Sequence, residues 1–365
     1  MNTIMKYAKK FLKRRHEKWI TRSLVGAGTV ILLSGASQSI WMSFLVSIYN
    51  DRFNKNIPDP NGSINYLYLT ICVVVGGGLI WLGLNFYFRT KENEKSKSMV
   101  LIQHCSIQTV SYANIDKDLS DYSLENYPIN QLEELMNIDS GSIQHALREQ
   151  EKAVERISSR INGSSDIEMA YLGLAHIPLT VLFGYQLSDK VNVSFYEWNQ
   201  NDLKWGAIES DTDLAFPTLY INTKDTVQDA QSTKEVVIKI GVTYPIPDED
   251  IQEIQLHKLN SYYLHLKPPH RNAIVSLEQL KTYKKIFRDL LDDINQKYPN
   301  LQRIHLFFAG QPSLAYILGS AITSRMDNEI WVYNHTRTET PKYKWCIRLP
   351  LRNRSIELKI NESRG

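Results

Sequence analysis

The stretch RIHLFFAGQPSLAYILGS, residues 303–320, is the most informative part of the chain, because an apolar strand pattern, a turn and an apolar helix pattern follow one another directly. A similar stretch, EMAYLGLAHIPLTVLFG, occupies residues 168–184. In both, a proline follows the alanine at the strand end by three residues, and a glycine follows that proline by 6 or 7 residues. We interpret them as two copies of one strand–helix–strand unit. A chance similarity between unrelated α/β units is the alternative.

Helix and strand patterns surround the two copies. Apolar residues at helical spacing predict helices over about 140–161 and 277–297, and Ser276 with Gln279 forms a capping box at the start of the second. Strands are predicted at 99–102, 168–175, 191–198, 235–243, 260–266, 303–309, 329–333 and 343–349. Strands that alternate with helices predict an α/β fold with mainly parallel sheets.

The N-terminal part has a different character. Residues 24–49 and 64–88 contain no Asp, Glu, Lys or Arg. Each run exceeds the roughly 20 residues that cross the hydrocarbon core of a bilayer, so we predict a membrane helical hairpin. A cleaved signal peptide is disfavoured because its apolar core usually has only about 7–15 residues. Buried helices of a soluble core are the other alternative.

Charge predicts the orientation of this hairpin. Residues 1–22 hold eight Lys and Arg, the loop 50–63 holds two, and residues 89–98 hold four. Cationic flanks stay in the cytoplasm, so both termini are expected there, and we predict a two-pass membrane protein. The formal net charge is +3 overall but −6 over residues 99–365. A domain of that charge is a poor candidate for binding a DNA or RNA polymer.

Small and weakly polar residues recur inside both spans. On a helix, a four-residue spacing places such residues on one face, where another helix can approach closely, and an amide in mid-membrane usually faces protein or water. The candidates for membrane assembly are Gly35, Gln38, Ser39, Ser43, Ser47, Gly76, Gly77 and Gly78. Packing within one hairpin and self-association between hairpins are both open.

Proline in the first turn of each helix of the repeat suits that position and leaves neighbouring backbone N–H groups free. Such a helix end attracts anions, and ligands of open α/β sheets bind beyond the carboxyl ends of the strands. Two facing copies would enclose a wide pocket for a ligand with several phosphates. Gln311 and Ser313 offer hydrogen bonds in one copy and His176 in the other. A structural turn or cap is the alternative at each position.

These residues resemble those of a SAVED domain. The resemblance extends over about residues 99–361 and is carried by 176–185, 193–196, Trp205, 304–312, Gly319 and 331–333. It implies two fused Rossmann-like (CARF-like) halves, at about 99–230 and 231–361, that sense cyclic oligonucleotides in bacterial anti-phage (CBASS) defence. With two N-terminal spans, the chain is similar to the transmembrane SAVED effectors of those systems.

The resemblance also implies which residues bind the ligand, namely those of the loops at the strand ends and two strand tyrosines. They are His104, Cys105, Ser106, His176, Ile177, Pro178, Thr243, Tyr244, Gly310, Gln311, Pro312, Ser313, Tyr196 and Tyr333. The implied ligand is a cyclic oligonucleotide, with a cyclic trinucleotide expected, made by a CD-NTase (cGAS/DncV-like) synthase. No metal, cofactor or catalytic residue is implied.

The expected organisation is a basic cytosolic N-terminus (1–22), a hairpin (23–90), a charged linker (91–98) and a SAVED domain (99–365). The expected function is a receptor-effector that binds the messenger, oligomerises and disrupts the membrane, which causes abortive infection. One alternative is a membrane-tethered Rossmann-like nucleotide-processing enzyme, including one that cleaves the messenger as a ring nuclease does. The chain contains no HExxH, GxSxG, Walker or GxGxxG motif to support an enzyme. A passive membrane scaffold is a further alternative.

Overall fold

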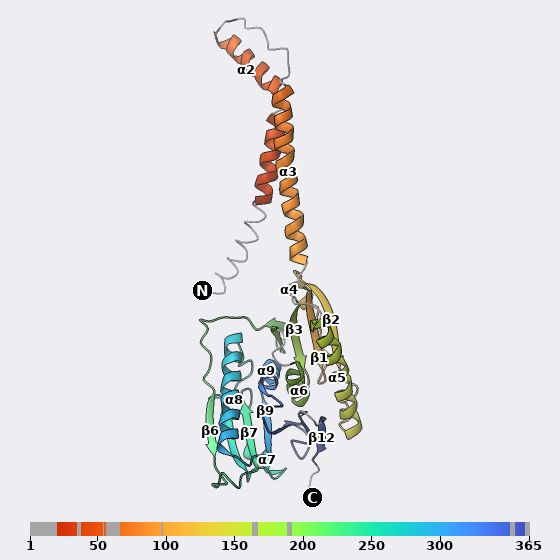
Figure 1. Cartoon of the computed structure of the whole chain (residues 1–365), viewed down its shortest axis with the longest axis vertical. Coiled ribbons are helices and arrows are strands. Elements are labelled where there is room, and N and C mark those ends of the chain that lie inside the picture. Colours follow the sequence, from red (N-terminus) through yellow and green to blue (C-terminus); the bar gives the residue numbers. More distant parts are fainter. Residues whose placement is uncertain are drawn as a thin grey trace. The chain divides into compact units, whose positions relative to one another are not determined.

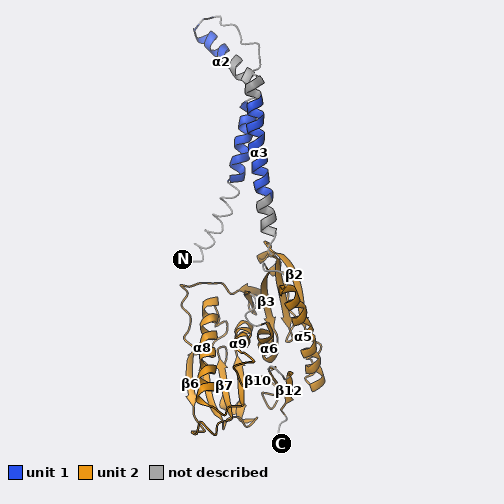
Figure 2. Cartoon of the chain, viewed as in Figure 1, with its two compact units in different colours: residues 1–96 blue, residues 97–365 orange. Residues whose placement is uncertain are grey.

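The computed structural model describes residues 20–34, 38–53, 55, 66–95, 98–162, 167–187, 192–350 and 355–361. The chain divides into two compact units, residues 1–96 and residues 97–365, which Figure 2 shows in blue and orange. Residues 91–98 were predicted to be a charged linker. In the structure, helix α3 (Tyr66–Lys95) extends into this segment as far as Lys95. Lys and Glu are strong helix formers, so a charged segment can prolong a helix as readily as interrupt it.

The first unit contains the helix Ile20–Ser34, helix α2 (Gln38–Phe53) and α3. The helix Ile20–Ser34 packs against α3 backbone to backbone (Figure 1). A Cβ atom added at Gly28 would lie 2.6 Å from the carbonyl oxygen of Gly76, and one added at Gly76 would lie 2.8 Å from that of Gly28. Glycine at both positions is therefore what lets the two helices touch.

One helical segment of the described residues, Thr70–Phe88 in α3, is long and apolar enough to cross a membrane by length and composition. Ile20–Ser34 is apolar but shorter. The first predicted span, 24–49, extends over Ile20–Ser34 and α2, and residues 35–37 lie outside the described part. A hairpin that crosses a bilayer therefore remains a prediction.

The predicted membrane-assembly residues have different environments. Gly76 lies in the contact just described. A Cβ atom added at Gly77 or Gly78 would meet nothing within 4 Å, and Ser47 is exposed on α2. Gly35 and the side chains of Gln38, Ser39 and Ser43 are outside the described residues. Of the predicted set, Gly76 thus lies in the contact between the helix Ile20–Ser34 and α3, whereas Gly77 and Gly78 face open space.

The second unit contains two sheets. The first has five strands, all parallel except the last, in the order β2 (Ser123–Asn130), β1 (Ser98–Cys105), β3 (Ile167–Leu174), β4 (Val193–Asn199) and β5 (Lys204–Ala207). The second has seven, in the order β12 (Glu357–Ile360), β11 (Trp345–Arg348), β10 (Glu329–Asn334), β9 (Arg303–Ala309), β7 (Glu235–Gly241), β8 (Asn260–His265) and β6 (Tyr220–Lys224). Strands β10, β9, β7 and β8 are parallel, and the remaining three are antiparallel to their neighbours.

The two sheets repeat one topology. The order β2-β1-β3-β4-β5 of the first returns as β8-β7-β9-β10-β11 in the second, with β6 and β12 added at the edges. The helices correspond as well: α4 (Ile115–Asp118) with α7 (Asp248–Gln252), α5 (Ser140–Asn162) with α8 (Leu277–Lys297), and α6 (Ile177–Leu187) with α9 (Pro312–Ala321). The interpretation of an internal duplication is confirmed, and it extends well beyond the two stretches that suggested it.

Helices α6 and α9 lie side by side between the sheets (Figure 1). An added Cβ atom would overlap the carbonyl oxygen of Tyr316 at Gly184 and that of Val181 at Gly319. The glycines of the repeat therefore let the two copies join at their backbones. Around this contact the halves share one hydrophobic core, where the Tyr316 ring lies 4.9 Å from that of Tyr171 and 5.2 Å from that of Phe195.

The predicted helices agree closely with α5 and α8, and Ser276 caps α8 by accepting the Gln279 backbone N–H at 3.2 Å. Strands β2, β5, β6 and β12 are not among those predicted from the sequence. Strand β2 contains Pro128, which is tolerated because β2 lies at the edge of its sheet. Since β6 pairs with β8, the second half begins near Tyr220, earlier than the predicted boundary at 230/231.

Candidate functional site

A cavity of about 400 Å³ lies where the carboxyl ends of the central strands of both sheets meet. The first half contributes the end of β3 and the end of β4. The second half contributes the segments that follow β7, β8, β9 and β10. The lining residues are Gly173, Leu174, Glu197, Trp198, Asn199, Gln200, Asn201, Thr243, Tyr244, Arg271, Asn272, Gly310, Gln311, Pro312 and Arg337. This is the position at which open α/β sheets bind ligands.

One side of this cavity combines an aromatic ring with two cations. The Arg271 Nε donates a hydrogen bond of 2.5 Å to the Tyr244 hydroxyl. The guanidinium carbons of Arg271 and Arg337 lie 5.6 Å and 5.8 Å from the centre of the Tyr244 ring. The tyrosine nevertheless remains 41% exposed. An accessible ring with two guanidinium groups near it can stack with a planar group while the arginines bind anions.

The N-terminus of α9 also lies at the cavity, and it already holds a carboxylate. Pro312 opens the helix, and the backbone N–H of Ser313 donates to the Glu197 Oε1 at 2.9 Å. Burial raises the pKa of Glu197 to about 7, although hydrogen bonding to Ser313 acts in the opposite direction. The Gln311 Oε1 accepts the Ile274 backbone N–H at 2.7 Å, so this side chain braces the loop before α8. The helix end at which the phosphate of a ligand was expected is therefore occupied by a carboxyl group of the chain itself.

The equivalent helix end in the first half is closed in another way. The Ser106 hydroxyl accepts the His176 backbone N–H at 2.8 Å, and its oxygen lies 2.7 Å from the His176 Nδ1. The His176 ring lies 5.9 Å from the ring of Trp345, which belongs to the second sheet. Burial lowers the pKa of His176 to about 4. The two residues thus cap α6 and contact the other half, and they do not line the cavity.

His104 is fully buried on β1. Its ring nitrogens lie 3.0 Å from the Tyr171 hydroxyl and 3.0 Å from the Gln131 side-chain oxygen. Burial lowers the pKa of this imidazole to about 4, so it is neutral at physiological pH. Cys105, next to it, is buried beside Asn130. Both residues occupy the interior at the end of β1 and lack access to the cavity.

The two strand tyrosines of the predicted set are also interior residues. Tyr196 packs in a cluster with Trp205, and the Tyr333 ring stacks on Phe307 at 4.4 Å between ring centres. Neither lines the cavity. The predicted residues that do line it are Thr243, Tyr244, Gly310, Gln311 and Pro312; those that do not are His104, Cys105, Ser106, His176, Ile177, Pro178, Ser313, Tyr196 and Tyr333. Ligand binding by any of them stays a prediction.

The charged residues of the cavity, Glu197, Arg271 and Arg337, are not among the site residues predicted from the sequence. Each lies at or just beyond the end of a strand that had been predicted from its apolar run, at 191–198, 260–266 and 329–333. Extending the strand-end rule to every parallel strand would have included them. Among the described residues, no group of three or more His, Cys, Asp and Glu side chains could hold a metal ion.

Comparison with known proteins adds the following. Structures with a similar arrangement include a Cap4 SAVED/CARF-domain containing receptor of Acinetobacter baumannii with the cyclic trinucleotide 2'3'3'-cAAA (15% identity, TM-score 0.44, 82% of this chain and 63% of that chain). The same receptor with 3'3'3'-cAAA has 14% identity, a TM-score of 0.43, and coverage of 90% and 76%. A Cap4 receptor of Moraxella osloensis has 12% identity, a TM-score of 0.40, and coverage of 90% and 76%. No curated protein matches the chain.

The chain thus spans less than two thirds of the first of these receptors. A family model, the SMODS-associated and fused to various effectors sensor domain, or SAVED, matches residues 150–349. The matched segment contains α6, α9 and the strand ends that form the cavity. Because this match covers more than half of the chain's length, the chain belongs to the SAVED family of sensor domains.

Proposed function

We propose that this protein is a membrane-anchored receptor-effector of CBASS anti-phage defence, and that it binds a cyclic oligonucleotide in the cavity between its two halves. The observation that carries the proposal is the exposed Tyr244 ring flanked by Arg271 and Arg337. A cyclic oligonucleotide presents planar bases and phosphates in alternation. The cavity offers a stacking surface and two planar cations within one site.

The chemistry of the three side chains fits such a ligand. A guanidinium group can donate two parallel hydrogen bonds to a phosphate. Stacking of a base on an aromatic side chain contributes about 1–3 kcal/mol. Residues 99–365 carry a net charge of −6, so attraction of the ligand would depend on the local field of Arg271 and Arg337. A cyclic trinucleotide made by a CD-NTase is the ligand we propose.

The N-terminal unit would supply the effector activity. Its helix α3 exposes large apolar side chains, among them Val74, Trp81 and Phe88, as a lipid-facing helix does. We propose two passes through the inner membrane, with both termini and the SAVED domain in the cytoplasm. Ligand binding would promote homo-oligomers whose clustered hairpins disrupt the bilayer and cause abortive infection. This coupling requires that the ligand bind the assembled form more tightly than the single chain.

We further propose that the messenger is bound and not consumed, so that the protein acts without enzyme activity. The nucleotide-processing alternative predicts a linear product. Incubating the full-length protein with the matching ring and separating the nucleotides by chromatography distinguishes the two. Recovery of the intact ring supports a receptor, and conversion of the ring to a linear product in many turnovers supports an enzyme.

Dye leakage tests the whole proposal. The full chain is reconstituted in liposomes of bacterial lipids that contain a self-quenched dye, and a panel of cyclic di- and trinucleotides is added. We expect leakage with the matching ring alone. Arg271→Ala or Arg337→Ala should raise the ring concentration needed by about tenfold or more, because each removes a charge-assisted contact.

Arg148→Ala is the matched control, because it removes an exposed arginine of α5 outside the cavity. This variant should respond to the ring as the wild type does. Liposomes that stay sealed with every ring would contradict the membrane activity. Unchanged sensitivity of both cavity variants would contradict the proposed site.

A further inference from the structure

Glu197 is the acidic residue among those that line the cavity, whose other charged lining residues are Arg271 and Arg337. It lies near the end of β4, and one of its oxygens accepts the Ser313 backbone N–H at 2.9 Å. Among the described residues, no ion pair joins this carboxyl group to Arg271 or Arg337, which line the same cavity. The carboxylate is therefore held in place by the start of α9 and keeps most of its acceptor capacity.

This position restricts what can lie beside Glu197. A carboxylate has two oxygens with about four lone-pair positions and no proton to donate when ionised. A phosphate next to it would be repelled, whereas groups with N–H donors would be attracted. The phosphates of a ring are thus directed toward Arg271 and Arg337, and a base edge is directed toward Glu197.

The bases differ in the donors that they present. Guanine carries a ring N–H and an amino group side by side on its pairing edge, with no acceptor between them. Adenine and cytosine present one amino group beside an acceptor nitrogen, and uracil presents one N–H between two carbonyls. We propose that Glu197 is a specificity-determining residue that accepts hydrogen bonds from a guanine of the cyclic oligonucleotide. The inference rests on the proposed function, because it assigns a base to the same cavity.

The test changes the protein and the ligand together. Full-length protein in detergent is titrated by calorimetry at pH 8, above the pKa of about 7 of Glu197, so that this carboxyl group is mostly ionised. Three rings are used: a cyclic trinucleotide that contains one guanine, the same ring with inosine in place of guanine, and an all-adenine ring. Inosine lacks only the amino group. We expect the wild type to bind the guanine ring about tenfold or more tightly than the inosine ring, as for a hydrogen bond to a charged group.

Glu197→Gln is the informative variant, because glutamine keeps an oxygen for the Ser313 N–H but replaces the other acceptor by an amide donor. Its preference for guanine over inosine should shrink to less than about twofold, given that the amino group has lost its charged partner. Glu155→Gln is the matched control: it removes one negative charge from an exposed position on α5 and should keep the wild-type preference.

Three outcomes separate the inference from the function on which it rests. Equal affinity of the wild type for the guanine and inosine rings overturns the role of Glu197, as does a guanine preference that persists in Glu197→Gln. In either case, binding of a ring by the wild type would still support the proposed receptor function. If the wild type binds none of the rings, the proposed function falls and this inference falls with it.

Discussion

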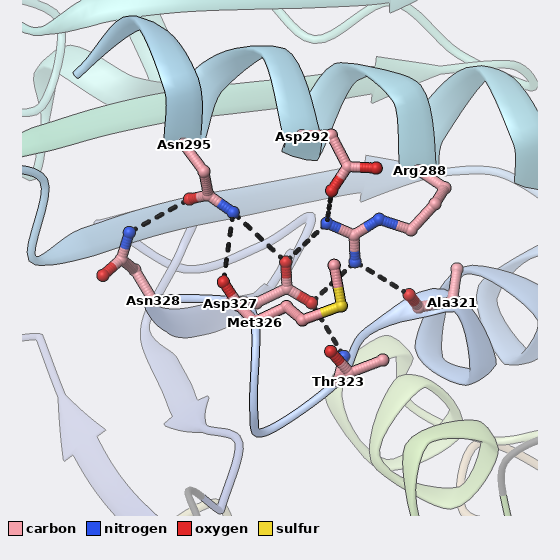
Figure 3. Close-up of polar contacts among 8 residues, drawn as sticks. All are labelled: Arg288, Asp292, Asn295, Ala321, Thr323, Met326, Asp327 and Asn328. Atoms are coloured by element: carbon pink, nitrogen blue, oxygen red, sulfur yellow. Dashed lines mark hydrogen bonds and ion pairs between the residues drawn. The ribbon is translucent and has the colours of Figure 1, made fainter. Parts of the chain in front are cut away.

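Arg288 on α8 and Asp327, in the loop after α9, are the centre of a side-chain network in the second half (Figure 3). The guanidinium donates two hydrogen bonds, of 2.7 and 2.6 Å, to the Asp327 carboxylate and one of 3.1 Å to the Ala321 carbonyl. Asp327 also accepts the Thr323 backbone N–H at 2.7 Å. A single buried carboxylate thereby joins α8 to the end of α9, whose other end lies at the cavity.

Asp327→Ala should be strongly destabilising, because the Asp327 side chain is 1% exposed and its loss leaves the largely buried Arg288 without this partner. We expect the free energy of unfolding to fall by about 2–4 kcal/mol. Asp292 pairs with the same arginine but is 49% exposed, so Asp292→Ala should cost less than about 1 kcal/mol. Urea unfolding of both variants measures the difference. Similar losses in the free energy of unfolding of the two variants would contradict a larger contribution of Asp327 than of Asp292 to stability.

Glu197 predicts a particular pH dependence of stability. Its pKa is raised from 4.5 to about 7 in the folded protein, so folding favours the protonated carboxyl. This residue therefore makes stability fall as the pH rises between those two values, and the loss is complete above the folded pKa. Glutamine does not titrate. Glu197→Gln should melt at a higher temperature than the wild type at pH 8 and at the same temperature at pH 4, by thermal unfolding; equal melting at pH 8 would refute this.

At the scale of elements, the contact of α6 with α9 is the joint between the two copies. Each helix contributes a glycine, Gly184 or Gly319, at a point where any side chain would overlap the backbone of the other helix. The first turns of the same two helices lie at opposite ends of this joint, and each turn is capped from elsewhere, α6 by Ser106 and α9 by Glu197. A movement of one helix relative to the other would therefore change the position of the residues at the start of α9, which line the cavity.

Gly184→Ala tests this joint. The added methyl group has no room unless the helices separate, so we expect a loss of about 1–3 kcal/mol in the free energy of unfolding. Gly206→Ala on β5 is the control, because a Cβ atom there meets nothing within 4 Å, and its effect should stay within about 0.5 kcal/mol. Chemical denaturation provides both values. A Gly184→Ala protein as stable as the control would exclude the close contact.

At the scale of the whole molecule, the proposed activity combines a receptor unit and a helical unit in one chain. The cationic residues that flank the apolar runs belong to both the N-terminus and the segment that leads into the second unit. If the two apolar runs cross the membrane as proposed, the positive-inside rule predicts that this unit lies in the cytoplasm, where a messenger made inside the cell would be found.

Protease protection checks this orientation. Trypsin added to spheroplasts that express the full chain should leave residues 97–365 intact, because the membrane would shield them, and detergent should make them accessible. A cytoplasmic marker protein is the control. It should resist trypsin in intact spheroplasts and be cleaved after detergent is added, as residues 97–365 are. Cleavage of the second unit in sealed spheroplasts would contradict the proposed topology.

The amino-acid sequence determined much of this protein by itself: the duplication, the equivalent helices α5 and α8 of the two copies, the Ser276 cap and most parallel strands. These features are local, since side-chain periodicity and turn chemistry act over a few neighbouring residues. Only the tertiary structure decided that His104 is interior, that β6 joins the second sheet, and that Tyr244 lies near two arginines. Glu197 and Ser313 are 116 residues apart, and their contact exists because two sheets pack through α6 and α9. Burial and charge pairing of this kind depend on long-range packing, which no short pattern of residues records.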